Sequence, residues 1–543
     1  MRKGSRLCLA VGSVLCAGLV GSAGASAATT VYRSATVGTV ARSAPATFAP
    51  ALGAPSLRDR GARRPGASSS PSAASVAAPL APGPQTLGTA ASVLTNFNGV
   101  SSRDSGITNF GGEFEPPDQG LCVGNGFVVE MVNSAYTVFN TSGKAVAGPF
   151  NINGPFNVGL TEFTSDPRCY YDLATNTWFA TILQINKEET ASSILVAVNN
   201  SGDPTKPWTT YQVNTTGLGG SSGPKDPGCP CFGDQPTLGI DRHNLYVTTN
   251  EFSILGPQFN GAQVYAFAKK QLASLSATVN VVHFAKLAVG GAPAASVQPA
   301  LTTGGPPAEY FMSSIDPTET FDQRIGVWAL TNQGAVEKGE VPTLSSVVLA
   351  SEAFGVPPKG EQKGAPSLID SGDDRMQQTQ FINGSVWGEL TSAVTIPGDT
   401  APRAGAAWFQ VKPTLAGGTI AAAKMQRQGY VAVAGNYVSY PSIQATPAGS
   451  AVMGVSITGS SRFPSTAYAT LGPSDAGFGP VVVSAAGRGH YAEAATRWGD
   501  YSFAVLDPSG SSVWLANEYV PPKASQTADG RRNWGTRVVQ VKP

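Results

Sequence analysis

The sequence predicts an all-β fold: a seven-bladed β-propeller of four-stranded blades, with the ring closed by an N-terminal strand. Three observations lead to this expectation. Gly and Pro account for 63 and 41 of the 543 residues, and only 13% are charged, a composition typical of short strands and turns rather than of long helices. A strand, turn, strand unit recurs seven times. The last of these units lacks an outer strand, which the N-terminal part of the chain can supply.

The repeated unit is a hairpin, because a polar turn such as Asn383-Gly384 separates two apolar runs in each copy. The seven copies begin at Asp118, Asp166, Asp234, Gln298, Asp374, Tyr440 and Asp500. Further apolar runs between copies, such as 194–198 and 209–213, bring each repeat to about four strands. Radial repetition of such sheets describes a propeller, which exposes only short sheet edges. Two β-sandwich domains are the alternative architecture.

The final repeat needs a strand from elsewhere in the chain. After its hairpin only one strand candidate remains, residues 536–541. Residues 92–97 precede the first hairpin and have no other place in the pattern. We therefore expect residues 92–97 to form the outer strand of the last blade.

The N-terminal 91 residues are expected to lie outside the folded domain, which spans residues 92–543. Residues 1–27 read as a secretory signal peptide, with a basic start, an apolar stretch and the small-residue site Ala25-Ser26-Ala27. Residues 28–91 are so rich in Ala, Ser and Pro that we expect a disordered leader. No later run approaches the roughly 18 apolar residues of a membrane span. We therefore expect a secreted, extracellular monomer without a membrane span.

Four cysteines follow the signal peptide: Cys122, Cys169, Cys229 and Cys231. On period-two strands of neighbouring blades, Cys122 and Cys169 point to opposite faces, so we expect a disulfide between them. Cys229 and Cys231 then remain as an adjacent pair or as two free thiols. Their Cys-Pro-Cys spacing, with no His nearby in the sequence, argues against a zinc knuckle.

The candidate site is the channel mouth, where the first strands of all blades begin. The candidate catalytic carboxyl groups there are Asp234, Asp374, Asp500, Glu251 and Glu518. An Asp that recurs in five of seven repeats favours a structural role, such as accepting backbone N–H bonds. Asp118, Asp166 and Asp374 are candidate Ca²⁺ ligands. No other cofactor is expected, because phosphate-binding, dinucleotide and metalloprotease motifs are absent from the sequence.

Arginine and aromatic residues at the same mouth are the candidate ligand-binding residues. Arg168, Arg375 and Arg497 break the repeat pattern, and guanidinium groups bind carboxylate, sulfate or phosphate. The alternative is that they pair with the adjacent Asp residues. Tyr440, Tyr501 and Trp498 offer flat faces on which a sugar ring stacks, although aromatic residues at strand starts more often pack in the core.

The segments PPDQGLC, DPRCYYD and RWGDYS resemble those of a group of secreted bacterial proteins of unassigned function that look like sialidase-like β-propellers. The resemblance covers roughly Pro116 to Val541 and implies export and a propeller, but no established activity. True sialidases use three arginines, a Tyr with a Glu partner and an Asp acid. By analogy with that class, the candidates for the arginines, the Tyr and the Glu are Arg168, Arg375, Arg497, Tyr440 and Glu518. Their S-x-D-x-G-x-T-W box is absent.

These observations favour a protein that binds a carbohydrate or other acidic ligand at the mouth. A glycoside hydrolase or polysaccharide lyase acting at the same mouth is the second hypothesis, and an adhesion or scaffold protein using the outer blade surfaces is the third. A nucleic-acid partner is not expected, because 36 Lys and Arg residues balance 35 Asp and Glu residues.

Overall fold

The computed structural model describes residues 28–33, 35–43, 92–112, 114–160, 162–219, 225–315, 321–491, 497–527 and 532–543. The expected signal peptide and most of the expected leader lie outside these ranges. Within them the chain is all-β, with helices limited to α1 (Ser102–Thr108), α2 (Lys269–Ala273), η1 (Gln333–Lys338) and η2 (Lys523–Ser525). No helix in this part of the chain is long and apolar enough to cross a membrane.

The described strands pair antiparallel in successive groups of four, and each predicted hairpin forms the first two strands of a group. The first three groups are β4 (Gly120–Gly124), β5 (Phe127–Met131), β6 (Ala135–Asn140), β7 (Ala145–Asn151); β8 (Phe163–Asp172), β9 (Thr177–Ile185), β10 (Ser192–Asn199), β11 (Thr209–Asn214); and β12 (Cys231–Ile240), β13 (Asn244–Ser253), β14 (Phe259–Ala268), β15 (Thr278–Phe284).

The next three groups are β18 (Gln298–Thr302), β19 (Ala308–Ser314), β20 (Asp322–Thr331), β21 (Thr343–Phe354); β24 (Gln378–Ile382), β25 (Ser385–Val394), β26 (Arg403–Ala416), β27 (Thr419–Val431); and β28 (Tyr437–Ala445), β29 (Ala451–Gly459), β30 (Arg462–Leu471), β31 (Val482–Ala485). The last group contains β32 (Phe503–Leu506), β33 (Val513–Tyr519), β34 (Gly535–Val541) and β3 (Val93–Ser101). Two small hairpins, β16 (Ala288–Val289) with β17 (Ala292–Pro293) and β22 (Gly360–Gln362) with β23 (Ala365–Ile369), lie between groups.

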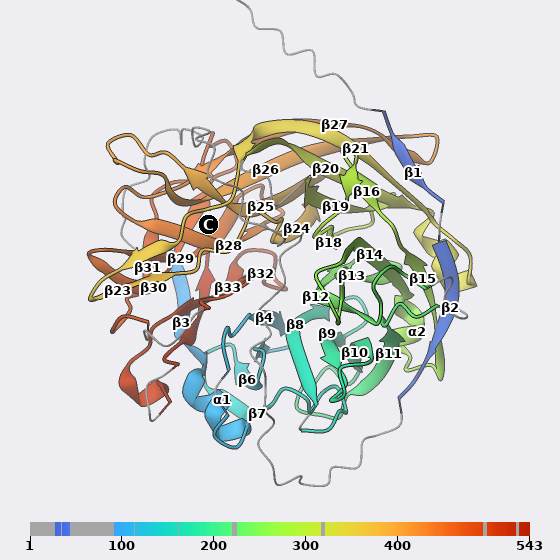
Figure 1. The fold of residues 1–543 in the computed structure, drawn as a ribbon, viewed down its shortest axis with the longest axis horizontal. Coiled ribbons are helices and arrows are strands. Elements are labelled where there is room, and N and C mark those ends of the chain that lie inside the picture. The colour runs from blue at the N-terminus through green and yellow to red at the C-terminus, as the bar shows by residue number, and fades with distance from the viewer. Residues whose placement is uncertain are drawn as a thin grey trace, which may run out of the picture.

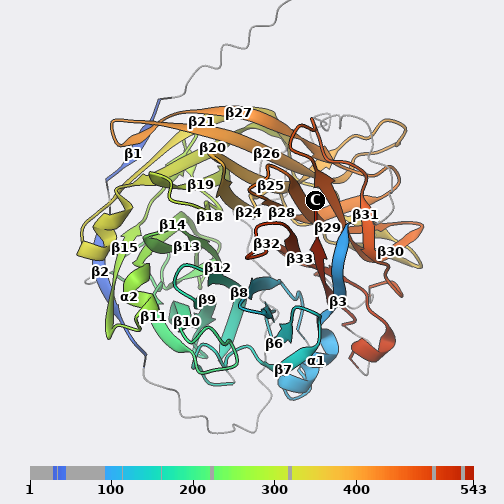
Figure 2. The same ribbon diagram turned by 180° about the vertical axis from the view of Figure 1, so that it is seen from behind.

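The groups follow one another around a common centre, with their first strands innermost (Figures 1 and 2). Three first strands even pair directly, since β18 is parallel to both β12 and β24. Because parallel strands begin at the same edge, the residues that open the hairpins gather at one end of the molecule. The hairpin turns gather at the opposite end. We call the first end the entry mouth and the second the turn face.

The predicted strand at residues 92–97 is present and continues to Ser101 as β3. It pairs antiparallel with β34, so that Val93 lies opposite Val541 and Phe97 opposite Val538. A buried carboxylate from the first group secures this strand, because Glu130 Oε2 accepts a hydrogen bond of 2.7 Å from the backbone N–H of Val100. Residues near both ends of the folded chain therefore share one sheet.

Two strands fall within the segment that the sequence predicts to be a disordered leader. β1 (Thr30–Tyr32) pairs with β21, and β2 (Ala35–Ala41) pairs with β15 along its whole length. For these residues the prediction of disorder is wrong. The leader composition supplies too few apolar groups for a core of its own, but the open edges of β15 and β21 offer backbone N–H and C=O groups that almost any sequence can pair with.

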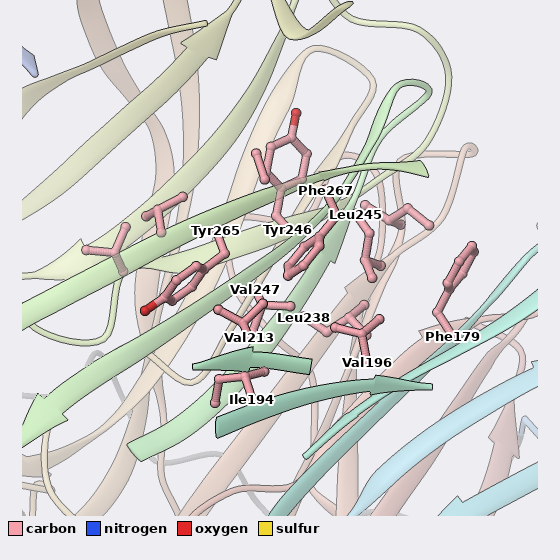
Figure 3. Packing of buried hydrophobic residues seen from close by; sticks show 14 of the residues in the cluster. Phe179, Ile194, Val196, Val213, Leu238, Leu245, Tyr246, Val247, Tyr265 and Phe267 are labelled. Atoms are coloured by element: carbon pink, nitrogen blue, oxygen red, sulfur yellow. The ribbon is translucent and has the colours of Figure 1, made fainter. Parts of the chain in front are cut away.

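Apolar side chains of neighbouring groups interlock between the sheets. In Figure 3, Ile194 and Val196 of β10 lie close to Leu245 and Val247 of β13, and Phe267 of β14 packs over them. Burial on both faces explains why a strand such as β10 carries the continuous apolar run 194–198 rather than an alternating pattern. Each sheet is thus stabilised by the sheets beside it.

Both cysteine pairs form disulfides. Cys122 of β4 joins Cys169 of β8, with 5.4 Å between their Cα atoms, so the predicted pairing between neighbouring repeats is confirmed. Cys229 and Cys231 are bonded to each other, which is the first of the two alternatives for this pair.

We predict that removing β3 strongly destabilises the fold. A chain that begins at Asp118 loses the six paired positions between β3 and β34 and the burial of Val100, which is 1% exposed. At about 1 kcal/mol for each backbone hydrogen bond and about 2 kcal/mol for a buried Val, the loss relative to a chain beginning at Ser92 is about 5 kcal/mol or more. Chemical denaturation followed by tryptophan fluorescence measures it, and equal midpoints for the two chains contradict the prediction.

A matched pair of substitutions in the full chain provides the control. Val100→Ala should lower the free energy of unfolding by about 1–3 kcal/mol. Leu94→Ala, on the same strand but 57% exposed, should change it by less than about 0.5 kcal/mol.

Candidate functional site

The backbone takes an unusual conformation in or just before several inner strands. Asp118, Asp166, Gln235 and Tyr440 have φ values of 49°, 61°, 48° and 50°, in the left-handed region that non-glycine residues rarely adopt. Register shifts lie beside three of these positions, between Ser165 and Arg168, Asp234 and Thr237, and Ser439 and Ser442. Bulges of this kind redirect side chains, and such strain persists only where the surroundings enforce it. The strained backbone at these four positions therefore fixes the direction of their side chains.

Three carboxyl groups meet at the entry mouth. One oxygen from each of Asp118, Asp166 and Asp500 lies within 4.8 Å of the other two. Asn133 fixes two of them: its Nδ2 donates to Asp118 Oδ2 (2.8 Å), and its Oδ1 accepts from the backbone N–H of Asp166 (2.7 Å). The backbone N–H of Asp500 donates to Asp118 Oδ1 (2.7 Å). We call Asp118, Asp166 and Asp500 the carboxyl cluster.

Burial and mutual repulsion favour the protonated forms of these acids. Burial, followed by the charges of Asp500 and Asp166, raises the pKa of Asp118 well above its usual range. Burial and then Asp234 and Asp500 raise the pKa of Asp166 to about 8. Burial also raises the pKa of Asp234 to about 7. At neutral pH the mouth therefore holds protons on buried carboxyl groups.

The three predicted arginines all lie at or near the mouth, and each has a partner. Arg375 is buried and forms a two-pronged ion pair with Asp373, with Nη2 2.8 Å from Oδ2. Arg497 forms an ion pair with Asp500. Arg168 lies over the ring of Tyr501, 3.3 Å from its centroid. Its Nε and Nη2 atoms are buried without a hydrogen-bond partner among the described residues.

The predicted aromatic residues are buried and pack in the core near the mouth. Tyr440 and Trp498 are each 2% exposed and belong to one apolar cluster with Trp534. Tyr501 is 1% exposed, and its hydroxyl donates to the backbone oxygen of Pro167. These side chains therefore pack in the core, and Tyr501 also holds the backbone between Asp166 and Arg168.

The remaining predicted acids take different places. Glu518 lies close enough to the carboxyl cluster for the charge of Asp118 to act on it. Burial is the larger effect, and together they raise the pKa of Glu518 well above its usual range. Asp374 is fully buried, but it is not part of the cluster. Of the three candidate Ca²⁺ ligands, only Asp118 and Asp166 come together, and Asp500 is the third member. Glu251 lies apart, beside Cys229 and Cys231.

Sequence reasoning did not single out Asn133 or a cavity at the turn face. That cavity has a volume of about 680 Å³ and is lined by hairpin-turn residues of several groups, among them Asp172, Asp241 and Asp507. Lys269 lines it and forms a buried ion pair with Asp172 (3.1 Å). Asn133 follows a hairpin rather than opening one, so the repeat pattern did not mark it.

Comparison with known proteins yields matches to solved structures at low sequence identity. No protein-family model matches the chain, and no curated protein does. An α-L-arabinofuranosidase from Fusarium graminearum, solved with an iminosugar inhibitor, is 10% identical, with 83% of this chain and 98% of that chain covered and a TM-score of 0.34. An α-L-arabinanase from Penicillium chrysogenum, solved with arabinobiose, is also 10% identical, with 82% and 98% covered and a TM-score of 0.33.

A protein of unknown function from Dyadobacter fermentans is 11% identical, with 70% of this chain and 95% of that chain covered and a TM-score of 0.32. At these identities and TM-scores, the matches assign neither a family nor an activity to this chain.

We predict that Asp166 makes the native state less stable as the pH rises. Its pKa is about 8 in the folded chain, against an ordinary value of 3.8, so the folded state holds a proton that the unfolded state releases. The stabilisation is complete below about pH 4 and is lost as the pH rises to about 8. Asp166→Asn, which tolerates the left-handed backbone, should flatten the decline of melting temperature over this range.

Asp203→Asn is the control, because hydrogen bonds from Thr205 hold the pKa of this half-buried Asp below its usual range. It should leave the slope between about pH 5 and 8 unchanged. An Asp166→Asn variant with the slope of the unsubstituted protein would contradict the prediction.

Proposed function

We propose that the protein is an exported, seven-bladed β-propeller that cleaves glycosidic bonds at its entry mouth. Seven successive groups of four antiparallel strands in the described ranges, the last one completed by β3, support the propeller. The basic and apolar N-terminal sequence with its small-residue cleavage site supports export.

The observation that carries the catalytic proposal is the carboxyl cluster. Hydrolysis of a glycosidic bond needs one carboxyl group that keeps its proton and another that is ionised. Asp166, with its pKa raised to about 8, suits the first role. Asp500, which forms an ion pair with Arg497, suits the second. The cluster reaches solvent at Asp500 and Arg497, whose side chains are 14% and 16% exposed.

The charge of the mouth favours a neutral glycan over an acidic one. Arg375 and Arg497 are engaged by Asp373 and Asp500, so they have little positive charge to offer an anionic ligand. Asp234 and Glu518, whose pKa values burial raises, add no positive charge that would bind it. A neutral sugar supplies hydroxyl groups that can pair with the same carboxyl oxygens.

The first test is substitution within the cluster. Asp166→Asn and Asp500→Asn should each lower kcat by about a thousandfold on a neutral glycan that the unsubstituted enzyme cleaves, because each removes a proton donor or a charged partner. Asp475→Asn, on an exposed loop, should leave kcat within about twofold. The assay is reducing-sugar release across a panel of neutral polysaccharides and aryl glycosides.

Binding of a glycan without cleavage in that panel would restore the simpler hypothesis of a carbohydrate-binding propeller. Cleavage retained in Asp166→Asn would remove this residue from the mechanism. We expect cleavage to survive a chelator, because Asn133, Arg497 and the Asp500 N–H already occupy both oxygens of Asp118 and one of Asp500. Loss of activity that only Ca²⁺ restores would identify the cluster as a calcium site instead.

The spacing of the cluster also predicts the stereochemical result. One oxygen of each acid lies within 4.8 Å of the others, which is compatible with the roughly 5–5.5 Å carboxyl separation of retaining enzymes. They are too close for the roughly 6.5–9.5 Å that leaves room for a water molecule in inverting enzymes. Proton NMR of the first product should therefore show the anomeric configuration of the substrate, and an inverted product would exclude this pair.

A further inference from the structure

A second cluster of reactive side chains lies apart from the carboxyl cluster. Cys229 precedes β12, Cys231 is its first residue, and Glu251 lies on the neighbouring strand β13. One ligand atom from each of the three residues lies within 4.8 Å of the others. All three side chains are buried, with residue exposures of 3%, 0% and 4%. The proposed function uses none of them.

Neighbouring amides orient this cluster. Asn260 Nδ2 donates to Glu251 Oε1 (2.9 Å) and also lies 3.6 Å from Cys231 Sγ and 3.9 Å from Cys229 Sγ. Gln263 Nε2 donates to the other oxygen of Glu251 (2.9 Å). Glu251 is thus held with one oxygen near the sulfur atoms. The amide of Asn260 would also stabilise negative charge on either sulfur.

We propose that reduction of the Cys229–Cys231 disulfide opens a Zn²⁺ site formed by the two cysteine thiolates and the Glu251 carboxylate. Thiolates and carboxylates are both established zinc ligands. With Zn–S bonds of about 2.3 Å and Zn–O bonds of about 2.1 Å, tetrahedral ligand atoms lie roughly 3.6–3.8 Å apart. Cys229 Sγ lies 3.9 Å from Glu251 Oε1, so only a small adjustment brings this pair to a shared metal.

The chemistry balances once the oxidised reductant is included. A phosphine and one water molecule become a phosphine oxide, or two thiols become a disulfide. Either reaction supplies two electrons and two protons, so the S–S bond breaks and each sulfur takes up a proton. Zn²⁺ then displaces both protons and binds two thiolates and one carboxylate. Three protein ligands leave the fourth position for water, as in open zinc sites. While the disulfide is intact the two sulfurs are bonded to each other and cannot bind a metal as thiolates, so metal binding depends on the redox state.

The surroundings permit a cation to enter. Lys225, Pro227 and Gly228 on the covering loop are exposed, so the buried sulfurs lie directly under the surface. Asp226 in the same loop is close enough to Glu251 to act on its charge. The sequence argued against a metal because Cys-Pro-Cys has no nearby His. The third ligand comes instead from β13, which the spacing of the cysteines does not show.

Metal content of the full chain tests the proposal. The protein is treated with a phosphine reductant under native conditions, freed of reductant without oxygen, incubated with Zn²⁺ and desalted. Alkylation mapping shows whether Cys229 and Cys231 are free, and circular dichroism shows that the fold is retained. We expect about one Zn²⁺ per reduced chain and none per unreduced chain. Cd²⁺ in place of Zn²⁺ should give a thiolate charge-transfer absorption.

Two variants and a control make the test specific. Cys231→Ser should abolish Zn²⁺ binding. Glu251→Gln, which keeps the disulfide and decides the matter if Cys231→Ser does not fold, should weaken it by about tenfold or more. Glu188→Gln removes an exposed carboxyl group elsewhere and should change nothing. A reduced chain that binds no Zn²⁺, unchanged binding in Glu251→Gln, or binding lost in Asp118→Asn instead would each overturn the proposal.

Discussion

The burial of carboxyl groups around the centre of the molecule is the constraint on which the entry mouth depends. An isolated carboxylate removed from water is strongly destabilising, so a buried acid must be protonated, paired or hydrogen-bonded. All three solutions occur here. Asp166 has a pKa raised to about 8, Asp500 pairs with Arg497, and Asp118 accepts hydrogen bonds from Asn133 and from the Asp500 backbone. Together these solutions allow three acids to lie buried or half-buried within one small volume.

The rest of the fold keeps these acids in place. The left-handed backbone at Asp118 and Asp166 is unfavourable by itself, and the flanking strands are buried on both faces by neighbouring sheets. The Cys122–Cys169 disulfide ties β4, which follows Asp118, to β8, which contains Asp166. Glu130, whose pKa burial raises to about 7, holds β3 against the first group. Rigid surroundings of this kind are what a preorganised site requires.

Different functions become available at different places in the fold. The carboxyl cluster and the Cys229, Cys231 and Glu251 cluster both form where the chain enters inner strands, and the turn face carries a separate cavity. Irregular entry loops can vary without disturbing the ladders behind them, which is why binding and catalytic groups concentrate on loops held by a rigid scaffold. The edges of β15 and β21 accept β2 and β1 for a related reason, since edge pairing requires backbone groups only.

The sequence by itself determined the all-β class, the positions of the hairpins, the strand at residues 92–97 and the Cys122–Cys169 pairing. Each depends on local patterns such as turn residues, period-two alternation and repeat spacing. Only the tertiary structure decided that Asp500 rather than Asp374 joins Asp118 and Asp166, that Asn133 holds them, and that Glu251 faces two cysteines. It also placed residues 30–32 and 35–41 on sheet edges. The physical reason is that desolvation, ion pairing and edge pairing depend on neighbours far away in the sequence, which no local pattern records.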